Sequence, residues 1–188
     1  MPNLIDLLQG TNQVLPAAVR NYERRLNVLE SIRISTISDV PAFSVAPSAL
    51  ARWAWRQVLR LSGRGNNVRL VTSTIRSAVG ATQHRRPAPG AVLYEVQIAF
   101  FGLEEHETPS VNGNVGVRCS CPAYYFWCWY ANHSAGCNFG TRFAPYIRKT
   151  PPPPVGLPYR NPSNIPMICK HLILLSNVLS SINFYRAP

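Results

Sequence analysis

Two short pairs of metal-type ligands constrain this chain more than any other feature. Cys119 and Cys121 are one residue apart, and Cys169 and His171 repeat that spacing later in the chain. Alternation along a strand would place both thiols of the first pair on one face. The second pair stands where a helix is expected to begin, and a helix N-terminus favours the thiolate form of a cysteine. Three thiolates and one imidazole form a closed zinc site, so the sequence predicts a metal centre joining a strand to a helix.

The chain has five cysteines, an odd number, and all of them lie in its second half. The first ten residues include Asp6 and no basic residue, so we expect no secretory signal there. A disulfide framework, which is typical of small secreted domains, is therefore not expected. Clustered cysteines in a protein made inside the cell favour a bound metal instead. The five residues are Cys119, Cys121, Cys128, Cys137 and Cys169.

The sequence leaves the fourth ligand and the metal open. Cys137 competes with His171 for the fourth position, and His133 is a weaker alternative because it lies near Cys137 in the sequence. Four thiolates would suit a 4Fe–4S cluster in place of zinc. Cys128 stands between two tryptophans and is predicted to be a core thiol. The ligands of the iron–sulfur alternative would be Cys119, Cys121, Cys137 and Cys169.

Residues 1–46 are predicted to form an N-terminal arm with one helix, which contacts other subunits more than its own domain. Apolar residues spaced by three and four follow one another over residues 16–32, which predicts a helix with a single apolar stripe. Residues 35–47 are largely polar and contain prolines, which predicts a linker. The stripe consists of Val19, Tyr22, Leu26 and Leu29.

Residues 47–188 are predicted to form one metal-binding α+β domain. It would begin with a helix over residues 49–62 and continue as a small antiparallel sheet of three strands. Runs of β-branched residues and alternation of apolar with polar residues indicate these strands. They are expected at residues 68–75, 92–101 and 115–121.

A long inserted loop over residues 122–168 is predicted to separate the two ligand pairs. Its start is rich in aromatic residues, and residues 124–130 contain no basic residue. Aromatic platforms that stack on bases usually alternate with basic residues, so this run favours a protein core or interface. A final apolar helix is expected after the second pair. Its apolar stripe would be Leu172, Leu175, Leu179 and Ile182.

The charge is strongly positive, with a formal net charge of +11 from 17 arginines, 2 lysines and 8 acidic residues. Nucleic acid is the simplest partner for such a chain. Arginine also suits protein interfaces, because its planar fork binds carboxylates and tolerates desolvation. The two aspartates, Asp6 and Asp39, cannot supply the acidic cluster of a two-metal nuclease. No catalytic triad or phosphate loop is recognisable, so we expect no enzyme, and no apolar run approaches the 18 residues of a membrane span.

The cysteine pairs resemble those of the SWIM zinc finger, in which C-x-C ends a strand and C-x-H opens a helix of a ββα unit. The matching segments are Cys119-Ser120-Cys121-Pro122 and Cys169-Lys170-His171-Leu172, with residues 94–98 as the paired strand. The resemblance covers about residues 68–183. It implies a zinc ion bound by the four residues of the two pairs. The 47 residues between the pairs (122–168) are more than is usual for the family.

The wider context is similar to SWIM-like proteins among the virion components of tailed phages. The similarity involves the aromatic run, Ala135-Gly136-Cys137 and Arg160-Asn161-Pro162. It implies a non-enzymatic structural protein of the virion, in the tail or baseplate, that is assembled in the host cytoplasm. Its partners would be other virion proteins in a large symmetric assembly, without membrane and without nucleic acid. A SWIM module that binds nucleic acid is the alternative, and an iron–sulfur structural protein is the second alternative.

Overall fold

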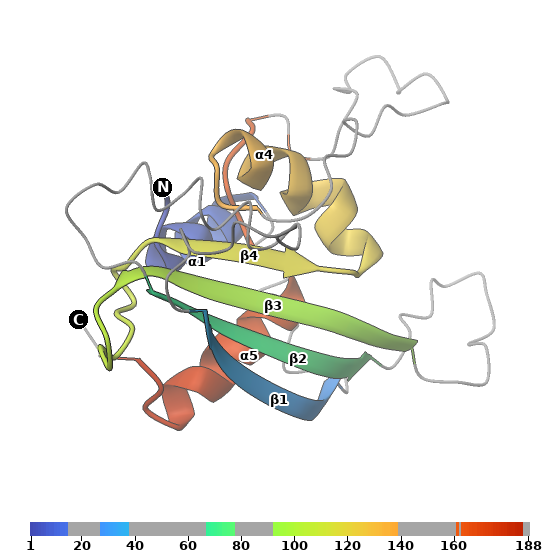
Figure 1. Cartoon of the computed structure of the whole chain (residues 1–188). Helices are drawn as coiled ribbons and strands as arrows, with labels where there is room; N and C mark the ends of the chain where they lie inside the picture. Colours follow the sequence, from blue (N-terminus) through green and yellow to red (C-terminus); the bar gives the residue numbers. More distant parts are fainter. Residues whose placement is uncertain (15–26, 38–66, 78–91, 139–160, 162, 186–188) are drawn as a thin grey trace, which may run out of the picture.

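A computed structural model describes residues 1–14, 27–37, 67–77, 92–138, 161 and 163–185, and these form an α+β fold (Figure 1). Four antiparallel strands make one sheet in the order β1-β2-β3-β4. The strands are β1 (Asn27–Ile37), β2 (Asn67–Ser77), β3 (Val92–Leu103) and β4 (Val115–Cys119). The helices are α1 (Leu4–Val14), the π-helix η2 (Tyr124–Cys128), α4 (Trp129–Ser134) and α5 (Lys170–Ser181).

The core lies between one face of the sheet and helix α5. Alternate residues of β3 are buried on that face, as period-two alternation requires, and their partners in β4 are buried as well. Phe100 lies 5.7 Å from Phe184 between ring centroids, just after the end of α5. Helices α1, η2 and α4 gather at the β4 end of the strand order, away from β1 (Figure 1). The fold therefore surrounds β4 on several sides.

Strand β1 corrects two expectations for the N-terminal part of the chain. The helix predicted over residues 16–32 is wrong for residues 27–32, which belong to β1, and the sheet has four strands where three were expected. Pairing with β2 along almost its whole length outweighs the apolar stripe, of which only Leu29 lies in β1. β-branched residues at positions 32, 34 and 37 suit a strand.

The described parts of residues 1–46 pack on their own chain. Helix α1 begins with reciprocal capping, because Asp6 N donates to Asn3 Oδ1 (2.9 Å) and Asn3 N donates to Asp6 Oδ2 (3.0 Å). Leu4 and Leu7 are buried in the core. These parts therefore belong to the fold of the chain itself, and the contact of residues 1–46 with other subunits stays a prediction. The predicted helix over residues 49–62 and the boundary at residue 46 lie outside the described residues.

The other strands and the last helix agree closely with expectation. Strands β2 and β3 cover the ranges predicted for the first two strands, and β4 ends at Cys119, two residues before the predicted end. Helix α5 begins at Lys170, and Ile182 follows its end with 53% of its surface exposed, so that residue does not extend the buried stripe. The predicted loop over residues 122–168 is not wholly irregular, because its start folds into η2 and α4.

Candidate metal centre

The structure brings together the four residues of the two ligand pairs. Cys119, Cys121, Cys169 and His171 offer one ligand atom each, and these atoms all lie within 4.8 Å of one another. All four side chains are buried, with exposed fractions from 1% to 6%. Cys119 is the last residue of β4, and Cys169 immediately precedes α5. The group could hold a metal ion, and its three sulfurs and one nitrogen are consistent with zinc.

The backbone between the first two cysteines is fixed to β3. Ser120 N donates to Glu95 O (3.0 Å), and Glu95 N donates to Ser120 Oγ (2.9 Å). This exchange extends the pairing of β3 and β4 by one residue beyond the strand. The chain then turns into η2, where Tyr124 N donates to Cys121 Sγ (3.3 Å). A backbone N–H directed at sulfur stabilises the thiolate form, which is the form that binds metal.

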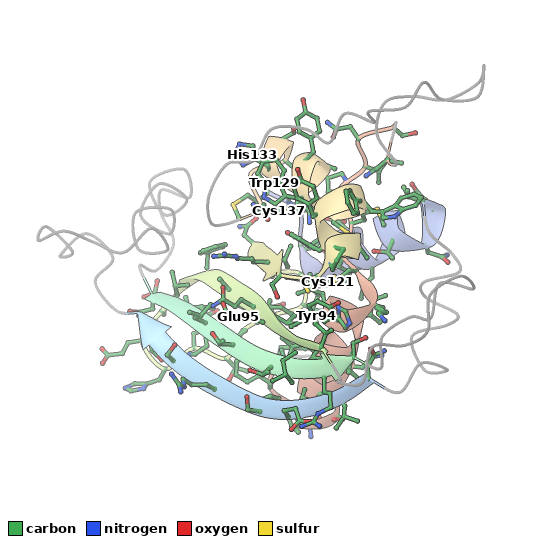
Figure 2. The ribbon with its side chains drawn as sticks, turned by 90° about the vertical axis from the view of Figure 1, so that its right-hand side faces the viewer. Tyr94, Glu95, Cys121, Trp129, His133 and Cys137 are labelled. Atoms are coloured by element: carbon green, nitrogen blue, oxygen red, sulfur yellow. The ribbon has the colours of Figure 1, made fainter. Side chains whose placement is uncertain are left out.

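The second pair is fixed by the start of α5. Cys169 has extended backbone angles (φ −84°, ψ 168°) and is the N-cap residue, and Ile173 N donates to its carbonyl oxygen (3.0 Å). His171 in the first turn points back toward the sheet, where the Tyr94 ring lies 4.8 Å from the imidazole between centroids. Figure 2 shows Cys121 between Tyr94 on the sheet and the η2–α4 segment. The imidazole is thus held against β3 by an aromatic ring.

The three thiols differ in acidity. Burial raises the pKa of Cys119 well above its usual value, and the neighbouring thiols Cys121 and Cys169 raise it further. Burial likewise raises the pKa of Cys169. The pKa of Cys121 is lowered, because Cys119 and Cys169 direct hydrogen bonds at its sulfur and His171 contributes in the same direction. Without a metal, one thiolate would therefore be solvated by two protonated thiols.

The contacts of the His171 imidazole show whether the site fits a metal ion. Its Nδ1 lies 3.8 Å from Cys119 Sγ, and its Nε2 is buried without a hydrogen-bond partner in the part of the chain that the structure describes. A buried polar ring with so little compensation is costly. Ligands at about 2.0–2.3 Å from a tetrahedral zinc ion lie roughly 3.5–3.8 Å apart. The separation from Nδ1 to Sγ is close to that spacing, so a metal bound through Nδ1 beside Cys119 would fit the site.

Cys137 and His133 do not join the group. Cys137 Sγ donates to Asn132 O (3.4 Å), and burial raises the pKa of this thiol to about 12. The His133 ring stacks on Trp129, with 5.2 Å between centroids and 9° between planes. In Figure 2, Cys137 lies with Trp129 and His133, away from Cys121. The alternative with Cys137 as fourth ligand is therefore not supported, and the four thiols of the iron–sulfur alternative do not meet. Cys128 is fully buried, as predicted for a core thiol.

Two asparagine side chains fix the segment ahead of Cys169. Asn132 Nδ2 donates to Met167 O (2.8 Å), and Met167 N donates to Asn132 Oδ1 (2.9 Å). Asn161 binds Ile165 in the same two-sided way, at 2.8 and 3.3 Å. The two side chains thus provide the hydrogen-bond partners that a neighbouring strand would provide for the backbone of Ile165 and Met167. In the sequence, Asn161 stands out only as part of a resemblance and Asn132 does not stand out, because a single Asn is typical of a turn.

No protein family, curated protein or solved structure matches this chain. Among the described residues, no helix has the length and apolar character needed to cross a membrane. What the site does must therefore be argued from its own chemistry.

Proposed function

We propose that this chain is a non-enzymatic structural protein whose fold is held by one zinc ion at Cys119, Cys121, Cys169 and His171. The observation that carries the proposal is the convergence of these four buried donor atoms within 4.8 Å. Structural zinc sites use four protein ligands, whereas catalytic sites keep one position for water or substrate. Four donors, each on a side chain with at most 6% exposure, leave no such position.

The arrangement of the ligands supports a SWIM-type site. Strand β3 pairs with β4, the C-x-C pair follows at the end of β4, and the C-x-H pair opens α5. This order is the ββα unit that the sequence resemblance implies. Strands β1 and β2, the helix α1 and the helices after Cys121 are additions around that unit.

The partners we propose are other structural proteins of a tailed-phage virion. The support is the sequence resemblance, together with a closed site and the absence of a recognisable catalytic set. Apolar side chains on several elements are exposed and could meet a neighbouring subunit, among them Val28 at 52% and Leu93 at 55%. Quantitative mass spectrometry of gradient-purified particles should find the chain at a fixed ratio to the other structural proteins. Its absence from the particles would contradict this assignment.

Elemental analysis of the purified full-length protein tests the zinc site directly. We expect about one zinc ion per chain. Cys119→Ser and His171→Ala should reduce the zinc content, whereas Cys128→Ser should not, because Cys128 is buried outside the group. A metal-free protein as stable as the zinc-treated protein would overturn the proposal. Iron with a brown absorbance would favour a cluster instead.

The exposed face of the sheet favours a second candidate function, the binding of nucleic acid. The pairings place Arg33, Thr72, Gln97 and Arg118 in one row across all four strands, and both arginines are exposed. Two cations in a row could contact phosphates, and the net charge of +11 would support the attraction.

A gel-shift titration at two salt concentrations separates the two candidates. Phosphate binding predicts an affinity that falls steeply with salt, and a weaker salt dependence for Arg33→Ala and Arg118→Ala. We expect only weak retention at low salt, which disappears near physiological ionic strength. A salt slope that requires roughly five or more phosphate contacts would favour the nucleic-acid function.

A further inference from the structure

Helix α1 contacts the strand that leads into the first ligand pair. Leu4 N donates to Val111 O (3.3 Å), and Val115 N donates to Pro2 O (3.4 Å). Asn3 and Asn114 form an antiparallel bridge between these two contacts. Val115 is the first residue of β4, whose last residue is the ligand Cys119. The N-terminal end of α1 is therefore attached to the C-x-C half of the site.

The other end of α1 contacts the segment that leads into the second ligand pair. Ile168 N donates to Thr11 Oγ1 (2.8 Å), and the same hydroxyl lies 3.0 Å from Ile168 O. Thr11 is fully buried, and Ile168 immediately precedes the ligand Cys169. Gly10, directly before Thr11 in the chain, packs so closely that a Cβ atom would lie 2.0 Å from Pro166 O. This end of α1 is therefore fitted to the C-x-H half of the site.

Helix α1 and a bound metal would hold the same two segments in the same arrangement. The two halves of the site are separated in the chain by 47 residues (122–168), so bringing them together has a large entropic cost. Whichever restraint forms first lowers that cost for the other. Two such restraints are thermodynamically coupled, and the coupling is reciprocal.

We infer that docking of α1 and metal binding at Cys119, Cys121, Cys169 and His171 strengthen each other. This inference rests on the proposed zinc site and adds a conformational element that governs it. Thr11 is a positioning residue, since it reaches the metal centre only through the backbone of Ile168. Loss of the docked helix would weaken the site, and loss of the metal would loosen the helix.

Two substitutions of Thr11 test whether loss of the docked helix weakens zinc binding. Thr11→Val keeps the volume and removes the hydroxyl, so the amide of Ile168 loses its partner, and the carbonyls of Leu7 and Ile168 lose the hydroxyl that lies between them. Zinc affinity, measured on the full chain by competition with a chromophoric chelator, should fall about tenfold, as for loss of other outer-sphere partners. Thr11→Ser keeps the hydroxyl and loses a buried methyl group, so it should bind zinc nearly as tightly as the wild type. Equal affinities for wild type and Thr11→Val would overturn the inference.

Hydrogen exchange tests whether loss of the metal loosens α1. Together with the zinc titration, it distinguishes a failure of this coupling from a failure of the proposed zinc site. When zinc is removed from the wild-type chain, the amides at the end of α1 should lose more protection than those of β2 and β3, which serve as the internal reference. Equal loss in all three elements would mean general unfolding and would contradict a specific coupling, as would no change in α1. A wild-type chain that binds no zinc in the competition titration would refute the proposed function itself.

Discussion

At the scale of single residues, the pKa values of the three clustered thiols determine how many protons a metal ion would displace on binding. Metal ligands must be deprotonated, so zinc binding releases a proton from each thiol that is protonated beforehand. The raised pKa values of Cys119 and Cys169 keep these thiols protonated at neutral pH, whereas the lowered pKa of Cys121 keeps that sulfur ionised.

Zinc binding at pH 7 should therefore release about two protons per ion, not three. The apparent affinity should fall as the pH falls, because protons compete for the two sulfurs with raised pKa. Isothermal titration in buffers of different ionisation enthalpy measures the proton count. Cys128→Ser is the control and should give the same count, since that thiol is outside the group. Release of three protons would contradict the assignment of Cys121 as a thiolate.

Asn132 shows how much a single side chain contributes away from the ligands. Asn132→Leu keeps a similar volume but leaves the amide and carbonyl of Met167 without partners in the core. Each unsatisfied backbone group costs about 1–3 kcal/mol, so the free energy of unfolding should fall by about 2–6 kcal/mol. Urea denaturation measures the difference. Asn12→Leu on the exposed side of α1 is the matched control, and an equal effect of both substitutions would show that the Met167 contacts contribute nothing.

The candidate ligands could be predicted from their short spacing in the sequence. The residues that position the ligand segments could not, because they lie far away in the chain. C-x-C at a strand end and C-x-H at a helix start each place two ligands locally, so the sequence could name all four candidates, with Cys137 as a competitor for the fourth position. Thr11 and Ile168 are 157 positions apart, and Asn132 and Met167 are 35 apart. No local pattern relates residues at such separations, because their contact depends on the finished fold.

At the scale of secondary structure, the fold departs most from the sequence prediction at β1. Strand β2 has a run of β-branched residues and β3 has alternating apolar residues, and both strands form where expected. The 11 residues of β1 include Glu30, Ser31 and Arg33, and most of them are exposed, so they carry a weaker signal. A bulge between Leu29 and Ser31 interrupts the alternation that would have indicated a strand.

Helix α1 depends on a glycine at its contact with the C-terminal segment. Gly10→Ala should destabilise the protein by about 1–3 kcal/mol, because the new methyl group meets the backbone oxygen of Pro166, which cannot move aside cheaply. An exposed helix position would respond in the opposite way, since alanine favours a helix over glycine by about 1 kcal/mol. Thermal melting of Gly10→Ala, beside Asn12→Ala as the exposed control, measures the effect. A rise in melting temperature for Gly10→Ala would show that α1 does not pack as described.

At the scale of the whole molecule, the candidate metal centre lies between the end of β4 and the start of α5. The C-x-C pair belongs to the sheet and the C-x-H pair to α5, which packs on β3 and β4. One bound ion would therefore link the sheet to its covering helix across the long insertion. Strands β1 and β2 contribute no ligand and pair extensively with the rest of the sheet.

Cys119→Ser should accordingly affect the molecule unevenly in the presence of zinc. Amides around β4, η2 and the start of α5 should exchange fastest, whereas those of β2 and the middle of β3 should keep more protection. Cys128→Ser is the matched control for the loss of a buried sulfur. Hydrogen exchange followed by mass spectrometry gives the comparison. A uniform increase in exchange for Cys119→Ser would show that the metal centre stabilises the whole fold as one unit.

The contact between Thr11 and Ile168 also sets the order of events during protein synthesis. A ribosome makes α1 early and the segment that receives it 157 residues later. Until that segment emerges, Leu4 and Leu7 have only part of their final surroundings, and half of the ligand set does not yet exist. Contacts between segments so distant in sequence form slowly, and exposed apolar surface invites aggregation during the wait. A metal held by all four residues could therefore not bind the nascent chain before translation has passed His171, and α1, although made earlier, gains its contact with Ile168 only late in synthesis.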